Sequence, residues 1–189
     1  AQSIPDTLGL DTKAKAAVVL DAATGRVLFA KNANARLPMA STTKIMSTLL
    51  TLEQDGQDEW FTVDPDAIRV EGSSMGLRAG DRVTLSALAY GMMLPSGNDA
   101  ANAAAVRIAG SKEAFARMMN ERAAELGMED SHFVTPSGLD DNAHYSSAYD
   151  MALLTREALS NPRFAEICSQ KSAKVCFGNP PADRWLSNH

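Results

Sequence analysis

The pattern of apolar and polar positions predicts a β-hairpin at the start of the chain and a helix soon after it. Residues 16–31 hold two apolar runs on either side of a turn at Ala23-Thr24-Gly25, which is typical of two paired strands. After Pro38, residues 41–53 carry apolar side chains at helical spacing, which predicts a helix with one buried face. The apolar positions of this helix are Ile45, Met46, Leu49, Leu50 and Leu52.

Beyond this helix, glycine- or proline-rich loops alternate with helical stretches. Pro95, Gly110 and Gly127 each follow an apolar or alanine-rich run and mark where it ends. In chain order we expect a loop-rich segment before residue 85, helices over 85–94, 99–109 and 112–126, a loop over 131–146, a helix over 147–160 that stops before Asn161-Pro162, and a weak strand over 172–177 followed by irregular chain.

Composition places the chain among ordinary globular proteins. Its 189 residues are enough for one compact unit with a sizeable core. No run approaches the roughly 20 apolar residues that a membrane-spanning helix needs. The net charge of -5 gives no basic surface of the kind that nucleic-acid-binding proteins use, so we expect no nucleic-acid partner.

Three further expectations concern processing, the thiols and metal binding. The chain begins with Ala1 rather than Met, which fits a mature secreted protein after signal-peptide removal and equally a trimmed polypeptide. Cys168 and Cys176 are either two free thiols or, in an oxidising compartment, one disulfide. His132, His144 and His189 lack the spacing of metal ligands, so we expect no metal and no cofactor.

Ser41 and Lys44 are the first candidates for chemistry. Residues at i and i+3 share a helix face, so the hydroxyl and the amine can touch. A serine hydroxyl becomes nucleophilic when a neighbouring base takes its proton, and a desolvated lysine can be that base. Acyl transfer is the reaction class that this pair indicates. Alone the pair is weak evidence, because an N-cap serine followed by a solvated lysine has the same spacing.

A second polar group follows about fifty residues later. Ser96, Gly97 and Asn98 lie on the predicted turn between two helices, where side chains can project into a cleft. The same three residues would also make an ordinary turn. Two such signals in this order are stronger evidence than either one.

Three segments carrying these residues make the chain resemble a known family. PMASTTKIMSTLL, GSSMGLRAGDRVTLSALAYGMMLPSGNDAANAAA and SHFVTPSGLDDNAHYSSAYDMALL are similar to the low-molecular-mass penicillin-binding D-alanyl-D-alanine carboxypeptidases of the serine S11 type. The resemblance covers nearly the whole chain. It implies an α/β fold of the β-lactamase/transpeptidase type, in which a helical subdomain lies beside an antiparallel sheet.

The resemblance also implies roles for the matching residues. Ser41 would be the acylated nucleophile, Lys44 its proton acceptor, Ser96 a hydroxyl that relays the proton to the leaving amine, and Asn98 a ligand of the substrate's backbone amide. The implied substrate is the D-alanyl-D-alanine end of a peptidoglycan stem peptide, which β-lactams mimic. Such an enzyme would work on the cell wall, outside the cytoplasm.

One element of the family pattern is missing. The family carries a Lys-Thr-Gly or Lys-Ser-Gly on a strand beside the site, and here only Lys171, in Lys-Ser-Ala, comes near. We therefore expect residues 1–189 to be the N-terminal part of a transpeptidase-like catalytic domain, with the hairpin at 16–31, the helical region at 41–160 and an incomplete C-terminal end. The missing motif and the late strands of the sheet would lie on a further C-terminal segment.

Two other interpretations remain open. A serine β-lactamase needs a group that activates the deacylating water, and Gly97 fits the carboxypeptidase pattern better than the Asp of class A β-lactamases. A catalytically incomplete module that binds peptidoglycan or regulates another enzyme would account for the missing motif. The acidic residues Asp140, Asp141 and Asp150 are interpreted as turn and capping residues.

Overall fold

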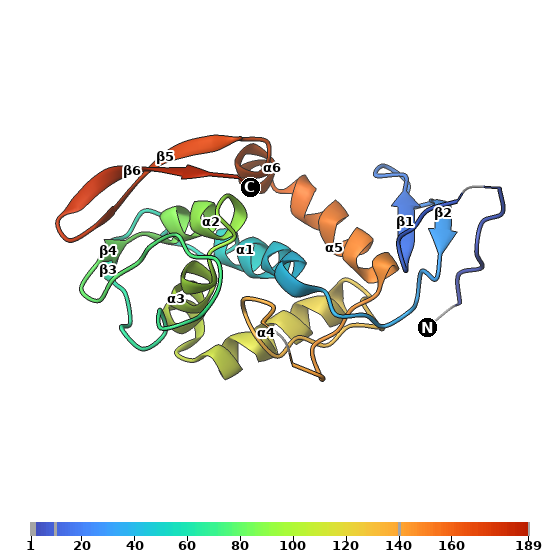
Figure 1. Ribbon diagram of the computed structural model, residues 1–189, viewed down its shortest axis with the longest axis horizontal. Helices are drawn as coiled ribbons and strands as arrows, with labels where there is room; N and C mark the ends of the chain where they lie inside the picture. The colour runs from blue at the N-terminus through green and yellow to red at the C-terminus, as the bar shows by residue number, and fades with distance from the viewer. Residues whose placement is uncertain (1–2, 10, 140, 189) are drawn as a thin grey trace.

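The computed structural model describes residues 3–9, 11–139 and 141–188 (Figure 1). The chain first forms a hairpin, then a group of helices, and last a second hairpin that crosses the helices. The elements are β1 (Ala17–Leu20), β2 (Val27–Lys31), the 3-10 helix η1 (Ala40–Thr43), α1 (Lys44–Leu52), β3 (Phe61–Thr62), β4 (Arg82–Val83), α2 (Leu85–Met93), α3 (Asn98–Ala109), α4 (Lys112–Glu125), α5 (Ala148–Ser160), α6 (Pro162–Cys168), β5 (Ser172–Gly178) and β6 (Pro181–Ser187).

Helix α1 occupies the middle of the molecule, and the other helices pack around it (Figure 1). The sequence predicted one buried face for this helix, and that was wrong: eight of its nine residues are buried. A helix enclosed on all sides lies within a core rather than on a surface. Its buried polar residues, among them Lys44 and Ser47, must therefore find partners inside the protein.

Helix α3 packs closely because its inner side is built from alanine. Ala100, Ala101, Ala103, Ala104 and Ala105 are all buried, and their short side chains bring the helix near α1 and α2. Asp99, at the start of α3, is close enough for its charge to act on the amine of Lys44, the first residue of α1.

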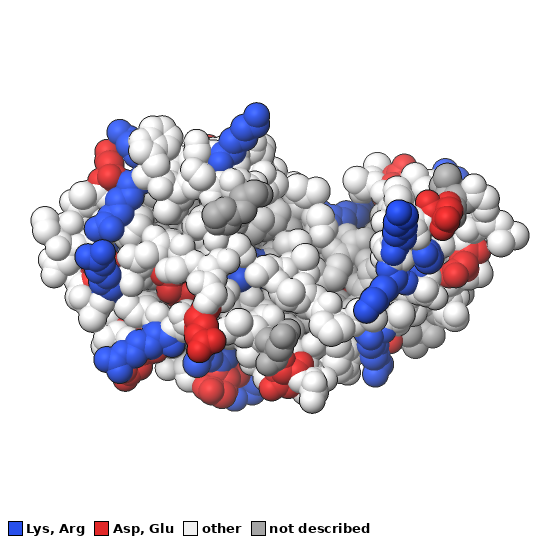
Figure 2. Space-filling view, in the orientation of Figure 1, with Lys and Arg blue, Asp and Glu red and all other residues white. Residues whose placement is uncertain are grey.

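The β1–β2 hairpin lies apart from the helical body, and the face shown in Figure 2 narrows between the two. Helix α5 anchors its turn, since the Arg156 guanidinium donates to the carbonyl oxygens of Ala22 and Ala23 at 2.7 and 3.1 Å. Within the described residues this sheet has only two strands. Val19 and Leu28 remain about half exposed, at 49% and 48%.

The end of the chain differs from the sequence prediction. The stretch expected to be irregular after residue 177 is strand β6, which pairs with β5 along its whole length in an antiparallel sheet of order β3-β4-β5-β6. Only Leu186 of β6 is buried, so the apolar alternation that reveals a strand is missing from the sequence. Its partner β5 does alternate, with Ala173, Val175 and Phe177 buried.

Helix α6 was also not predicted. Asn161-Pro162 was interpreted as a stop signal, yet the Asn161 side chain caps a new helix by accepting from the backbone N–H groups of Arg163 and Phe164, with Pro162 in the first turn. The hairpin and the helices expected over 85–94, 99–109, 112–126 and 147–160 are confirmed to within a residue or two. Among the described residues, no helix combines the length and apolar character needed to cross a bilayer.

Candidate active site

Ser41 and Lys44 lie at the junction of η1 and α1. Ser41 belongs to the 3-10 turn and Lys44 is the first residue of the α-helix, so the expectation that Ser41 begins the α-helix was wrong by one turn. In a 3-10 helix residues i and i+3 eclipse each other, which aligns the two side chains. The Lys44 Nζ donates to Ser41 Oγ at 3.0 Å. Ser41 is exposed at the surface while Lys44 extends into the protein.

Burial changes the acidity of Lys44. The residue is only 2% exposed, and its Nζ donates a second hydrogen bond to the Ser137 carbonyl oxygen at 2.9 Å. Desolvation of the ammonium lowers the pKa of Lys44 to about 8, although the negative charge of Asp99 opposes this shift. A substantial fraction of the amine is thus neutral near pH 8, which is the form that can accept a proton.

The loop over residues 135–138 closes over Lys44 and is fixed by the helix beneath it. Besides the Lys44 contact, Ser47 Oγ donates to the Pro136 carbonyl oxygen at 2.6 Å. Gly138 has φ of +84°, and a Cβ there would overlap the Ala40 carbonyl oxygen, so the loop approaches η1 through a residue without a side chain. The sequence predicted a loop over 131–146 but no part for it in the site, because its contributions are backbone carbonyls and a close approach.

A buried histidine joins the same loop to η1. His144 Nε2 lies 2.7 Å from Thr43 Oγ1, and His144 Nδ1 accepts from the Val134 N–H at 2.9 Å. Burial lowers the pKa of His144. The sequence placed this residue in a polar loop and assigned it no role. Its partner Thr43 lies between Ser41 and Lys44 in the sequence. That position beside two candidate residues was the one sequence feature that could have suggested a role for Thr43.

The second motif lies on the turn between α2 and α3. Ser96 adopts a left-handed conformation with φ of +56°, which is uncommon for a residue with a Cβ. Gly97 donates from its N–H to the Gly91 carbonyl at 2.8 Å, and a Cβ at this position would lie 2.8 Å from the same oxygen and from Asp99 Oδ1. The turn therefore has no room for a side chain at residue 97. Within the described part of the chain the Ser96 hydroxyl has no hydrogen-bond partner.

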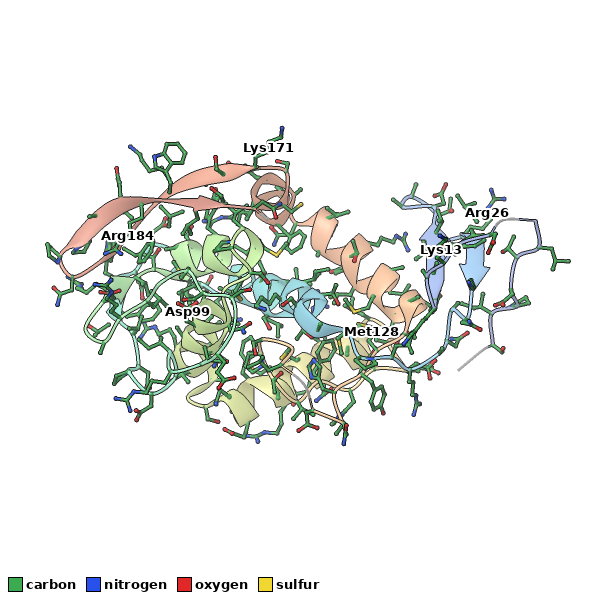
Figure 3. All side chains as sticks on the ribbon, viewed as in Figure 1. Lys13, Arg26, Asp99, Met128, Lys171 and Arg184 are labelled. Carbon is green, nitrogen blue, oxygen red and sulfur yellow. The ribbon has the colours of Figure 1, made fainter. Side chains whose placement is uncertain are left out.

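Asn98 and Asp99 attach this turn to the loop over residues 71–77. Asn98 Nδ2 donates to the Glu71 carbonyl at 2.7 Å, which leaves Asn98 Oδ1 as its available acceptor. The buried Asp99 carboxylate, labelled in Figure 3, accepts from Ser74 Oγ at 2.7 Å and from three successive loop amides. Asp99 was not predicted as a site residue, and its effect on the pKa of Lys44 places it in the electrostatic environment of the base.

The structure thus brings Ser41 and Lys44 into direct contact and positions Ser96 and Asn98 on a turn beside α1. Neither Ser96 nor Asn98 hydrogen-bonds to Ser41 or Lys44 among the described residues. A cavity of about 810 Å³ has Ala40 and Gly138 in its wall, but Ser41, Lys44, Ser96 and Asn98 are not among the residues that line it.

Of the acidic residues and cysteines named in the sequence analysis, those that the structure describes accept backbone hydrogen bonds or are free thiols. Asp141 accepts from the Ala143 N–H at 2.7 Å within a turn, and Asp150 accepts from the Asp130 N–H at 2.8 Å. Cys168 and Cys176 are free thiols. Asp140 and His189 lie outside the described residues. In the part of the chain that is described, no group of three or more His, Cys, Asp or Glu side chains could hold a metal ion.

Comparison with known proteins identifies relatives along nearly the whole chain. Residues 2–187 match the sequence profile of the peptidase S11 family, described as D-alanyl-D-alanine carboxypeptidase. The D-alanyl-D-alanine carboxypeptidase DacF of Bacillus subtilis is 40% identical over 158 residues, which are 81% of this chain and 41% of DacF. DacC of Escherichia coli is 41% identical over 194 residues, covering 93% of this chain and 48% of DacC.

Solved structures agree with this likeness. A D-alanyl-D-alanine carboxypeptidase from Mycobacterium tuberculosis superposes with a TM-score of 0.88 and 32% identity, over 100% of this chain and 70% of that one. The DD-transpeptidase of Streptomyces K15 gives a TM-score of 0.86 with 27% identity, over 95% of this chain and 76% of that one. The predicted transpeptidase-like fold is confirmed. The chain spans about half the length of the curated relatives it matches.

Proposed function

The chain belongs to the peptidase S11 family of D-alanyl-D-alanine carboxypeptidases, and we propose that it carries the nucleophile of such an enzyme, which removes the terminal D-alanine from peptidoglycan stem peptides. The single observation that carries this proposal is the buried Lys44 amine, 3.0 Å from Ser41 Oγ, with its pKa lowered to about 8. A lysine in this state can act as a base near neutral pH.

In the proposed reaction, Lys44 Nζ takes the proton of Ser41 Oγ as that oxygen bonds to the carbonyl carbon of the penultimate D-alanine. The oxyanion that forms would be stabilised by the Ser41 N–H, which has no hydrogen-bond partner within the described residues. The C–N bond then breaks, and the leaving amine receives a proton through the Ser96 hydroxyl. Water hydrolyses the acyl-enzyme and regenerates Ser41.

Asn98 would position the substrate. Its Nδ2 is occupied by the Glu71 carbonyl, so Asn98 Oδ1 is the atom that would accept from a backbone N–H of the peptide. β-Lactams would enter the same site and acylate Ser41, because they present a reactive amide in the place of the D-alanyl-D-alanine bond.

We also propose that residues 1–189 form the N-terminal part of the catalytic domain and that a Lys-Thr-Gly or Lys-Ser-Gly strand from a further segment completes the site. Two observations support this. The relatives extend well beyond the matched region, and β1 pairs on one edge only within the described residues. An additional strand could extend this sheet, since a two-stranded sheet alone is marginal in water. The substrate also implies that the protein works outside the cytoplasm, after a signal peptide has been removed.

The test is to incubate the full-length protein with a labelled penicillin and to follow its intact mass over time. The proposal expects a long-lived adduct on Ser41 that is absent in Ser41→Ala and present in Ser160→Ala, an exposed serine at the end of α5. It also expects release of D-alanine from a peptide ending in D-alanyl-D-alanine. Rapid release of hydrolysed drug would favour the β-lactamase interpretation. Absence of both adduct and turnover would favour a non-catalytic module and would contradict the proposal.

A further inference from the structure

We propose that His144 is a positioning residue for the Ser41–Lys44 pair: its neutral imidazole connects η1 to the loop whose Ser137 carbonyl holds the Lys44 amine. This inference rests on the proposed function, because it concerns the activation of the same nucleophile. His144 does not touch Ser41 or Lys44 itself, and acts through the elements that carry them.

The hydrogen bonds of His144 define one protonation state. His144 Nδ1 accepts from the Val134 N–H at 2.9 Å, with a longer contact of 3.4 Å from the Thr135 N–H. A backbone N–H can only donate, so this ring nitrogen carries no proton. The proton of the neutral ring is then on Nε2, which donates to Thr43 Oγ1 at 2.7 Å. Both contacts are buried, since His144 is 4% exposed and Thr43 is 0% exposed.

The two contacts of His144 connect the two elements that position Lys44, namely η1 and the loop over residues 135–138. Thr43 directly precedes Lys44 in the chain, Val134 directly precedes the loop over residues 135–138, and Thr135 is the first residue of that loop. The imidazole therefore fixes the separation between η1 and the loop. The Phe133 ring, which meets His144 edge-on at 5.8 Å between centroids, holds the imidazole from the side. If this connection were lost, only the Ser47 hydrogen bond and the close approach at Gly138 would hold the Ser137 carbonyl against Lys44 Nζ.

Protonation of His144 would break the arrangement. An imidazolium has a proton on both nitrogens, so its Nδ1–H would point at the Val134 N–H, donor against donor. Two titratable groups on its own loop act on the pKa of His144: Asp141 raises it and His132 lowers it. Across the contact, the basic side chain of Arg36 shares a cavity with His144, and the basic side chain of Lys44 follows Thr43 in the chain. Burial is the largest influence on the pKa of His144 and favours the neutral ring.

Three substitutions separate the two contacts. His144→Asn retains an acceptor near the Nδ1 position, His144→Gln retains a donor near the Nε2 position, and His144→Phe retains neither. His132→Gln is the matched control, because His132 is an exposed histidine of the same segment whose ring contacts the Ala143 carbonyl rather than η1. We expect His144→Phe to slow acylation of Ser41 by penicillin roughly 10- to 100-fold, as small displacements of reacting groups do. His144→Asn and His144→Gln should each recover part of the rate.

The pH profile distinguishes positioning from general support of the fold. In the wild type, acylation should fall with the first power of proton concentration where only Lys44 titrates. At lower pH it should fall with the square, once His144 also becomes protonated. In His144→Asn and His144→Gln the square dependence should disappear. Identical profiles in the wild type and in these variants would overturn the inference, even if penicillin still labels Ser41.

A measurement that needs no activity keeps the inference testable if the proposed function fails. Amide hydrogen exchange at Val134 and across residues 135–138 should become faster in His144→Phe and stay unchanged in His132→Gln, with both variants folded by circular dichroism. Unchanged protection of this segment in His144→Phe would overturn the inference whether or not Ser41 is acylated.

Discussion

The two motifs of the site are held in opposite ways. The Ser41–Lys44 pair is closed in: the amine has two fixed acceptors, and the loop above it is fixed by Ser47 and by the close approach at Gly138. The Ser96 turn is open, with an unpartnered hydroxyl in a left-handed conformation among the described residues. The difference indicates that the protein assembles the nucleophile and its base in advance, while the relay hydroxyl is held available for a substrate.

The largest expected effect comes from displacing the loop that encloses the Ser41–Lys44 pair. Gly138→Ala would place a methyl group against the Ala40 carbonyl and would force the loop away from Lys44. We expect acylation of Ser41 to fall at least ~100-fold and the free energy of unfolding to drop by about 2–4 kcal/mol.

Gly127→Ala is the control for this substitution. Gly127 also has positive φ, at +75°, but a Cβ there meets nothing within 4 Å. This variant should lose only about 1 kcal/mol from backbone strain and keep its acylation rate. The acylation rate is measured by mass spectrometry and the stability by urea unfolding. Equal losses of rate in the two variants would show that the contact between Gly138 and Ala40 does not determine the acylation rate.

Asp99 follows the Ser96 turn and also acts on the pKa of Lys44, so its replacement should affect both the turn and the Ser41–Lys44 pair. Asp99→Asn leaves the amide donors of residues 75–77 without their carboxylate, and we expect about 2–3 kcal/mol of destabilisation. The negative charge of Asp99 raises the pKa of Lys44, so its removal should lower that pKa below about 8. The acid limb of the acylation profile should then move to lower pH, even though the rate itself falls.

The matched variant is Asp66→Asn, which removes an exposed carboxylate whose ion-pair partner, Arg69, is also at the surface. It should change neither stability nor the acid limb. A shift of the Asp99→Asn limb to higher pH would contradict the assigned electrostatic role.

At the Ser96 turn, one substitution should increase stability and decrease activity. Ser96→Gly removes the cost of a side chain in the left-handed region, about 1–2 kcal/mol, against about 0.5–1 kcal/mol for the greater freedom of unfolded glycine. We expect a net gain of up to about 1.5 kcal/mol in the free energy of unfolding, measured by thermal or urea unfolding. The loss of the hydroxyl should reduce turnover of a D-alanyl-D-alanine peptide by roughly 100-fold.

Ser96→Ala separates the two effects. It should lose the same activity without the gain in stability, because alanine keeps the Cβ. A stabilised Ser96→Ala would contradict the backbone strain assigned to the turn, and a fully active Ser96→Gly would contradict the part assigned to its hydroxyl in the reaction.

The same contrast explains how much could be predicted from the sequence. The Ser41–Lys44 contact follows from an i, i+3 spacing, and the turn at Ser96 follows from a proline after an apolar helix, so both were accessible from local patterns. The Ser137 carbonyl, the His144 contact and the Asp99 interactions depend on segments that meet only after folding. Strand β6 was missed for a related reason: its pairing with β5 defines it, while its own side chains are almost all exposed.

The central claim is that a desolvated Lys44 activates Ser41, and the pH dependence of acylation tests it most directly. Penicillin has no group that titrates between pH 6 and 10, so the rate of adduct formation on Ser41 in the full-length protein reports the enzyme. The pKa of Lys44 is lowered, so its neutral form increases as the pH rises. The rate should therefore increase with pH and level off above an apparent pKa of about 8. A rate independent of pH over this range, or one that still rises towards the ordinary lysine pKa of 10.5, would contradict the account.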